Sequence, residues 1–138
     1  MVLTRSITEL CVADHRNDPA AIAAWTANKS VAGIEAMLAD PGLSLFVALS
    51  EGHVAAVGAL TRDSIGLNYV HPDFRFRGVS KSLLAAMEAA LKAANVPIAR
   101  LQSTLTARTF YLDQGWAEGP PVPPGRFIQA YPMHKRLD

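Results

Sequence analysis

A glycine flanked by three cations is the feature of this sequence that could do chemistry most directly. Arg75 and Arg77 precede Gly78, and Lys81 follows it within one turn. A β-rich segment ends at Val70 and a long amphipathic stretch begins after Gly78, so the glycine lies between a strand and a helix. The first N–H groups of a helix lack intrahelical partners, and the helix dipole favours negative charge there. The sequence therefore predicts an anion site, with a phosphate or pyrophosphate as its occupant.

Other phosphate and nucleophile motifs do not fit this segment. Taken singly, each of its basic residues would also suit a solvated loop. Gly78 is followed by Val-Ser-Lys, which breaks the Walker pattern, and G-x-G-x-x-G does not occur. Residues 78–82, GVSKS, lack the last glycine of the G-x-S-x-G nucleophile elbow, and 138 residues are too few for that hydrolase fold.

The elements that must position this segment can be predicted from hydrophobic periodicity. Alternating and helical patterns follow one another in the order β-α-α-β-β-β-α-β-α-β, which predicts an α/β (α+β) fold. The predicted strands are residues 6–12, 43–49, 53–60, 65–70, 98–102 and 127–136, the last interrupted by Pro132. The predicted helices are residues 18–27, 30–38, 79–94 and 106–114.

Composition limits the classes of function. The 138 residues suit a single domain over 1–138, and the net charge of +1 offers no general field for nucleic acid or a membrane surface. Cys11 is the one cysteine, so neither an intramolecular disulfide nor a cysteine zinc cage can form, and a cytoplasmic setting is expected. No segment approaches the roughly 18 apolar residues of a membrane span.

Residues 70–80, VHPDFRFRGVS, resemble the coenzyme A signature of the GCN5-related N-acetyltransferase (GNAT) family. In that signature a strand ending in V-x-P precedes [QR]-x-x-G-x-[GA] at the head of a helix. Arg75 matches the first position and Gly78 the central glycine, with Ser80 in place of Gly or Ala.

Two later segments are similar to the same family. Residues 107–116, ARTFYLDQGW, match its A-x-x-[FL]-Y-x-x-x-G-[FW] element, with Thr104 where Asn is frequent. Residues 131–137, YPMHKRL, match its last strand, Y-x-M-x-K-x-L. The resemblance implies a mixed, mostly antiparallel sheet that is splayed after the fourth strand and has helices on both faces.

The resemblance also implies a cofactor and a catalytic residue. Acetyl-CoA would enter the splay as co-substrate, without a metal, and its pantetheine would pair with backbone at Tyr69 and Val70. Tyr111 is the implied general acid, which would protonate the departing coenzyme A thiolate. The implied cofactor-binding residues are Tyr69, Val70, Arg75, Phe76, Arg77, Gly78, Val79, Ser80, Lys81, Thr104 and Phe110.

A general base is not evident. An alkylamine with a pKa near ~10.4 is only about 0.04% neutral at pH 7, and residues 64–70 contain no carboxylate. Asn68 can orient an amine or water but cannot take its proton, while His71 and Asp63 better suit exposed turns. We therefore expect proton removal through ordered water, or an acceptor of lowered pKa. Trp25 is a candidate for the acceptor side, although core packing would explain it equally well.

The leading hypothesis is an N-acetyltransferase that moves the acetyl group of acetyl-CoA to a primary amine by direct attack in a ternary complex. The acceptor would be a small molecule or a peptide, and the resemblance implies a homodimer, with neither nucleic acid nor membrane as partner. Cys11 suits core packing better than a role as acetyl carrier. The alternative is a non-catalytic acyl-CoA-binding sensor or partner-binding module on the same fold.

Overall fold

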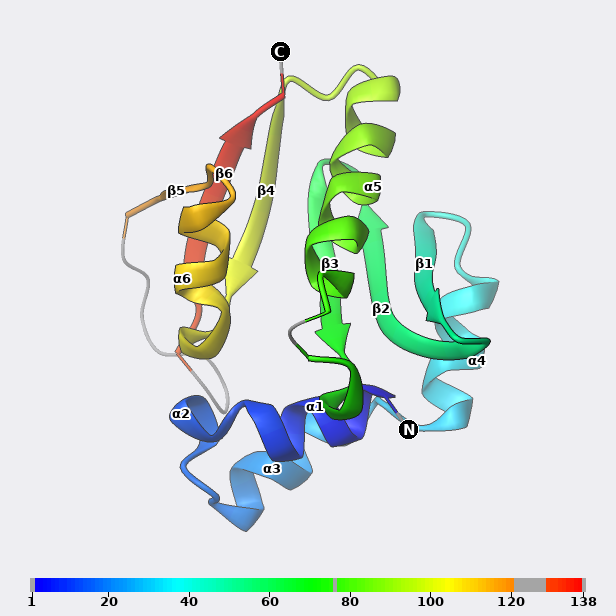
Figure 1. The fold of residues 1–138 in the computed structure, drawn as a ribbon, viewed down its shortest axis with the longest axis vertical. Helices are drawn as coiled ribbons and strands as arrows, with labels where there is room; N and C mark the ends of the chain where they lie inside the picture. The colour runs from blue at the N-terminus through cyan, green and yellow to red at the C-terminus, as the bar shows by residue number, and fades with distance from the viewer. Residues whose placement is uncertain (1, 76, 121–128, 138) are drawn as a thin grey trace.

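Six strands form one mostly antiparallel sheet, and helices pack against both of its faces (Figure 1). The computed structural model describes residues 2–75, 77–120 and 129–137. The strands are β1 (Leu43–Ser50), β2 (His53–Thr61), β3 (Ser64–Val70), β4 (Ile98–Ser103), β5 (Ala117–Glu118) and β6 (Tyr131–Arg136). The helices are α1 (Val2–Leu10), α2 (Val12–His15), α3 (Pro19–Thr26), α4 (Val31–Ala39), the 3-10 turn η1 (Pro72–Phe74), α5 (Val79–Ala93) and α6 (Leu105–Asp113).

The strand order is β1-β2-β3-β4-β6-β5, and the pair β3–β4 is parallel whereas the other neighbours are antiparallel. The parallel pair is joined through α5, because parallel neighbours need a crossover connection. The β1–β2 turn has positive φ at Glu51 (54°) and Gly52 (79°), as a type I′ hairpin requires.

The middle of the chain confirms the predicted elements to within one or two residues. Helix α3 begins where Asp18 accepts a hydrogen bond from the Ala20 N–H, with Pro19 in the first turn. Helix α4 begins where Ser30 accepts one from the Gly33 N–H at 3.1 Å. These caps are local features, so the sequence alone could locate them.

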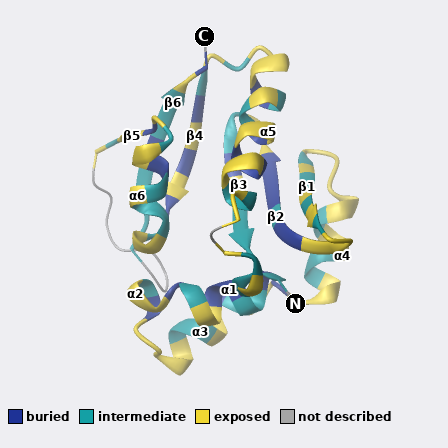
Figure 2. Cartoon of the chain, in the orientation of Figure 1, coloured by how far each residue is buried: buried dark blue, intermediate teal, exposed yellow. Residues whose placement is uncertain are grey.

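Side-chain alternation along β1 divides the packing between the two faces of the sheet. Phe46 and Ala48 pack against the main core, which includes Leu84 and Met87 of α5. Leu45 and Val47 instead line an apolar groove with residues of α1 and α4. Figure 2 shows the most buried segments along the middle strands and the inner side of α5.

The predicted strand over residues 6–12 is wrong. This segment belongs to α1 and α2, so the chain begins with four helices and the splay follows the third strand rather than the fourth. Ile7 and Cys11 lie four residues apart and are both buried, which is helical spacing; with Leu3 they place one apolar stripe against the rest of the molecule. The β-branched residues of the segment favoured the strand prediction, and packing overrode that weak propensity.

The last strand also differs from its prediction. Strand β6 runs from Tyr131 to Arg136 without interruption, and Pro132 takes its place opposite Gln102 of β4. The two-residue strand β5 pairs with the other edge of β6 and was not predicted. The first two residues of the predicted range, 127 and 128, lie outside the described residues.

Candidate active site

The sheet opens between β3 and β4. Strand β3 pairs with β2 from Ser64 to Val70, but its ladder with β4 holds only Ser64–Arg100 and Ile65–Leu101. The two strands diverge beyond that point, as Figure 1 shows. From Gly66 onward this edge of β3 borders a cavity of about 370 Å³.

Six elements contribute to the described wall of this cavity, among them β4 and the 3-10 turn η1. Strand β3 lies between the start of α5 and the start of α6, and α1 closes the far side. The lining includes most of the residues predicted to hold the cofactor: Tyr69, Val70, Arg75, Gly78, Val79, Ser80, Lys81, Thr104 and Phe110. Tyr111 and Asn68 line it as well.

Two predicted site residues, Arg77 and Trp25, are absent from the described lining of the cavity. The Arg77 guanidinium lies over the ring of Phe74, 5.2 Å from its centroid. Trp25 is 4% exposed and packs with Ile7 and Cys11. Phe76 lies outside the described residues.

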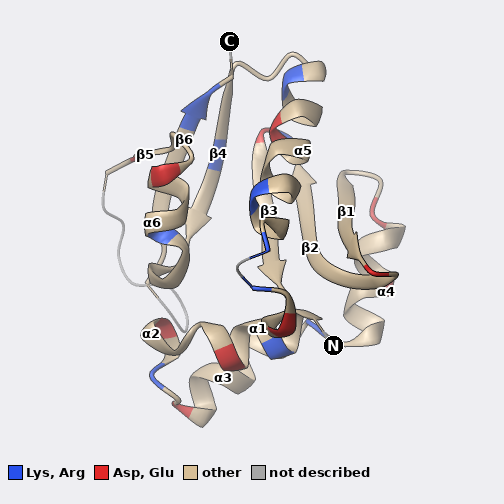
Figure 3. Cartoon of the chain, in the orientation of Figure 1, with Lys and Arg blue, Asp and Glu red and all other residues tan. Residues whose placement is uncertain are grey.

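Gly78 makes the turn into α5. Its φ is +74°, a left-handed conformation that suits glycine, and no other group lies within 4 Å of where a Cβ would stand. Helix α5 has 15 residues, and Gly78, Val79, Ser80 and Lys81 at its start all line the cavity. The loop leading into α5 and its first turns carry basic residues (Figure 3). N–H groups, dipole and cations thus favour an anion at this end of the cavity.

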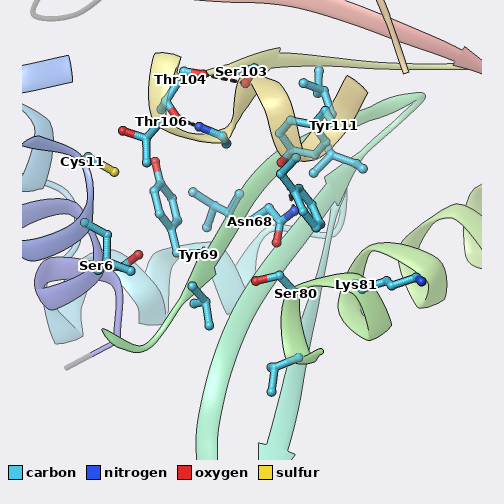
Figure 4. Close-up of a pocket in the computed structure, with 18 of the residues that line it drawn as sticks. Ser6, Cys11, Asn68, Tyr69, Ser80, Lys81, Ser103, Thr104, Thr106 and Tyr111 are labelled. Carbon is cyan, nitrogen blue, oxygen red and sulfur yellow. Dashed lines mark hydrogen bonds between the residues drawn. The ribbon is translucent and has the colours of Figure 1, made fainter. Parts of the chain in front are cut away.

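Tyr111 and Asn68 meet inside the cavity. The Asn68 amide donates a hydrogen bond to the Tyr111 hydroxyl oxygen at 2.9 Å (Figure 4). Burial raises the pKa of Tyr111 to about 12, and the bond from Asn68 lowers it by a smaller amount. The phenol therefore keeps its proton at neutral pH, and its O–H hydrogen is available to a group in the cavity.

Tyr69 lies on the opposite face of β3, because successive strand residues point to opposite sides. Its hydroxyl accepts a hydrogen bond from the Trp25 indole N–H at 3.2 Å. Figure 4 shows the Tyr69 ring extending toward Cys11 and Thr106. The cavity therefore passes through the splay, with Tyr111 on one face and Tyr69 on the other.

No Asp, Glu or His belongs to the part of the cavity wall that the structure describes. Asp63 forms an ion pair with Arg100 at 3.4 Å at the other end of β3. The His71 ring accepts from the Asp73 N–H and lies 3.2 Å from the Arg5 guanidinium. Neither side chain lines the described cavity; Asp63 lies in the turn before β3, as expected, whereas His71 is half-buried rather than exposed.

Cys11 lines the cavity beside Tyr69. Burial raises the pKa of its thiol to about 12, and the charge of Asp14 adds to the effect. A thiol acts as nucleophile in its ionised form, so this environment disfavours Cys11 as a carrier of the acetyl group.

Sequence reasoning missed the wall that α1 and the following Cys11 provide. Ser6, Leu10 and Cys11 line the cavity, and the helical spacing of Leu3, Ile7 and Cys11 was the signal that could have indicated a helix there. No local signal pointed to Asp14, whose carboxylate accepts from the N–H of Leu105 at 2.6 Å and of Thr106 at 3.1 Å, and from the Thr106 hydroxyl.

The family model described as "Acetyltransferase (GNAT) domain" matches residues 11–137. The chain belongs to this family of acetyltransferases. Among curated protein sequences, none matches the chain.

Solved GNAT structures resemble the fold over most of its length. A GCN5-related N-acetyltransferase from Rhodopseudomonas palustris is 25% identical, with a TM-score of 0.84 over 96% of this chain and 84% of that one. PaiA N-acetyltransferase from Thermoplasma acidophilum, in complex with coenzyme A, is 14% identical, with a TM-score of 0.79 over 98% and 88%. An acetyltransferase from Bacillus anthracis, in complex with acetyl coenzyme A, is 19% identical, with a TM-score of 0.62 over 75% and 68%.

The described part of this GNAT chain contains neither a membrane-spanning helix nor a cluster of metal ligands. Its helices include none with the length and apolar character needed to cross a bilayer. Its His, Cys, Asp and Glu side chains form no group of three or more that could hold a metal ion.

Proposed function

We propose that the chain transfers the acetyl group of acetyl-CoA to a primary amine by direct attack in a ternary complex. The observation that carries this proposal is the cavity in the splay, which brings the start of α5 and the Tyr111–Asn68 pair together. Family membership supports acetyl transfer, and the coenzyme A complexes of two structural neighbours support the choice of donor.

The chain offers separate groups for the two ends of the cofactor. The N–H groups at the start of α5, with Arg75 and Lys81, suit the diphosphate. The edge of β3 near Tyr69 and Val70 lies outside the β3–β4 ladder, so its backbone suits the amide-bearing pantetheine arm. When bound in this way, acetyl-CoA supplies the thioester that the amine attacks.

Tyr111 is proposed to protonate the departing thiolate. Its hydroxyl keeps its proton at neutral pH because burial raises its pKa to about 12. Asn68 donates to the hydroxyl oxygen, which fixes the direction of the phenol and stabilises the negative charge that grows on it as the proton leaves.

Removal of the amine proton is assigned to solvent rather than to a side chain. The titratable groups of the described cavity wall are Cys11, Tyr69, Arg75, Lys81 and Tyr111, and none is a base suited to neutral pH. An ordered water can carry the proton away, or the acceptor can arrive neutral if its own pKa is low. Asn68 can orient either of them through its carbonyl oxygen.

The lack of a general base in the described wall also favours a second candidate function. A protein that binds acyl-CoA as a signal needs the anion site and the splay but no base. The described wall has these features, so it suits a sensor as well as it suits an enzyme that loses the amine proton to solvent.

Turnover with a panel of amines separates the two functions. We expect steady release of coenzyme A and acetylated amine by mass spectrometry. Tyr111→Phe should lower kcat by about 100-fold while leaving the Kd for acetyl-CoA unchanged. Tyr131→Phe, a matched loss of a hydroxyl outside the cavity, should leave both constants unchanged. Tight binding of acetyl-CoA by calorimetry without product from any amine would instead identify a sensor.

A further inference from the structure

The two faces of the cavity differ in charge. The charged side chains among the described lining residues are Arg75 and Lys81, both in the segment that leads into and begins α5. The face on the other side of β3 is formed by Ser6, Leu10, Cys11 and Tyr69. Serine and leucine carry no charge, so the charge of this face depends on the thiol and the phenol.

Both titratable groups of this face stay neutral in the physiological range. Burial raises the pKa of Cys11 to about 12 and raises that of Tyr69 well above its ordinary value. The Tyr69 hydroxyl is also held by the Trp25 indole N–H. The described residues of this face therefore carry no charge, and they present aliphatic, aromatic, thiol and small hydroxyl groups.

Two charged side chains near the face, Asp14 and Arg75, act on the Cys11 thiol with opposite sign. Asp14 raises the pKa of Cys11 and Arg75 lowers it, so their effects partly cancel. The Asp14 carboxylate is already bonded to two N–H groups and one hydroxyl of α6, at Leu105 and Thr106. Those bonds direct both of its oxygens at the helix and leave it poorly placed to pair with a ligand cation.

We propose that this face takes an acceptor amine whose body is uncharged and apolar near the reacting nitrogen, and that it selects against diamines and amino acids. The inference rests on the proposed function and adds the class of acceptor. A second ammonium or a carboxylate would have to leave water for a face whose described residues carry no charge, and such a transfer is costly unless the charge is paired. An aliphatic or aromatic body would instead gain by covering Leu10 and Tyr69.

Three amines with the same five-carbon chain test the class of acceptor. Pentylamine ends in a methyl group, 1,5-diaminopentane in a second ammonium and 5-aminopentanoate in a carboxylate. We expect kcat/KM for pentylamine to exceed the value for each of the other two by about tenfold or more. Equal or higher kcat/KM for the diamine would overturn the inference while leaving acetyl transfer intact.

Leu10→Glu sharpens the test because it places a carboxylate in the proposed face. Leu10 is half-buried at the end of α1. We expect the ratio of kcat/KM between diamine and pentylamine to rise by about tenfold in this variant. Leu10→Gln controls for the change of shape, and Thr8→Glu adds the same charge at an exposed position of the same helix. An unchanged ratio in Leu10→Glu would place the acceptor elsewhere.

The outcomes separate this inference from the function on which it rests. Acetyl-CoA affinity, measured by calorimetry, reports that each variant is folded and that the cofactor end of the cavity is intact. If none of the three amines, nor any larger amine, is acetylated, the proposed function fails and the acceptor class fails with it. The wild-type comparison needs no variant, so it decides the class even if Leu10→Glu does not fold.

Discussion

The two edges of strand β3 have different neighbours: one edge pairs with β2 over its whole length, and the other borders the cavity. Along β2 the strand is paired from Ser64 to Val70, whereas along β4 the ladder ends after Ile65. The paired edge belongs to the part of the sheet that α5 covers, and the unpaired edge borders the cavity. A single strand therefore carries both the core and the site.

The paired side is closely packed. A Cβ at Gly58 of β2 would lie 2.7 Å from the Met87 sulfur, so the end of the Met87 side chain packs directly over this glycine. Leu84 and Met87 are at most 1% exposed there. On the unpaired side, by contrast, Gly78 has open space around it. The difference teaches that the stability of this fold and its binding chemistry depend on separate residues, which substitutions can test one at a time.

The largest effect on stability is expected from Leu84→Ala on the paired side. The change leaves a cavity under a fully buried side chain and should lower the free energy of unfolding by about 2–5 kcal/mol. Urea denaturation measures it, while the Kd of the folded protein for acetyl-CoA should stay the same. Leu112→Ala, at a position that is 44% exposed, should cost far less. A similar loss in both variants would contradict the comparison.

On the unpaired side, Arg75→Glu should weaken acetyl-CoA binding without unfolding the protein. Replacing a cation by an anion beside the start of α5 removes a charge-assisted bond to the diphosphate and adds repulsion, which we expect to raise Kd by about 10- to 100-fold. Lys92→Glu makes the same charge reversal near the end of α5 and serves as control. Equal affinity for wild type and Arg75→Glu in calorimetry would remove the diphosphate from this end of the cavity.

The pH profile tests whether the unpaired side lacks a base. If solvent takes the proton, kcat/KM should rise by about tenfold per unit between about pH 6.5 and 8.5, because the neutral fraction of the amine rises in that proportion. The pKa of Tyr111 is raised to about 12, so its acid form persists over this range and should cause no decline in rate. An amine of lower pKa should reach its plateau at a lower pH. A plateau at one pH for both amines would point to a titrating group of the protein.

The smallest effect is expected at the link between α2 and α6. Asp14→Ala removes the carboxylate that caps α6 and should cost about 1–2 kcal/mol of stability. Because α6 carries Tyr111, turnover should also fall by severalfold. Asp18→Ala removes a comparable cap from α3. It should lower stability to a similar degree with turnover unchanged, and a loss of turnover in both variants would show that the link has no special role in the site.

Contiguous segments account for what could be predicted of the site. Arg75, Gly78 and Lys81 lie within seven residues at a strand–loop–helix junction, so the prediction of an anion site follows from local geometry. Tyr111 was identified through the resemblance of residues 107–116 to the GNAT element, whose positions all lie within one helix and its end. Arg77 had the right charge and position in sequence, yet its side chain lies over Phe74 instead of in the cavity.

By itself, the sequence determined the main strands and helices from Asp18 to Asp113, the cluster of basic residues and glycine at the start of α5 and the family resemblance, because these depend on neighbours within a few turns of chain. Tertiary structure decided the rest. It made a helix of residues that also suit a strand, since Ile7 and Cys11 are buried against Trp25. It also placed α1 and Asp14, more than 50 residues away from β3 and α6, beside them. Contacts between segments so far apart in the sequence depend on the packing of whole elements, which no local pattern encodes.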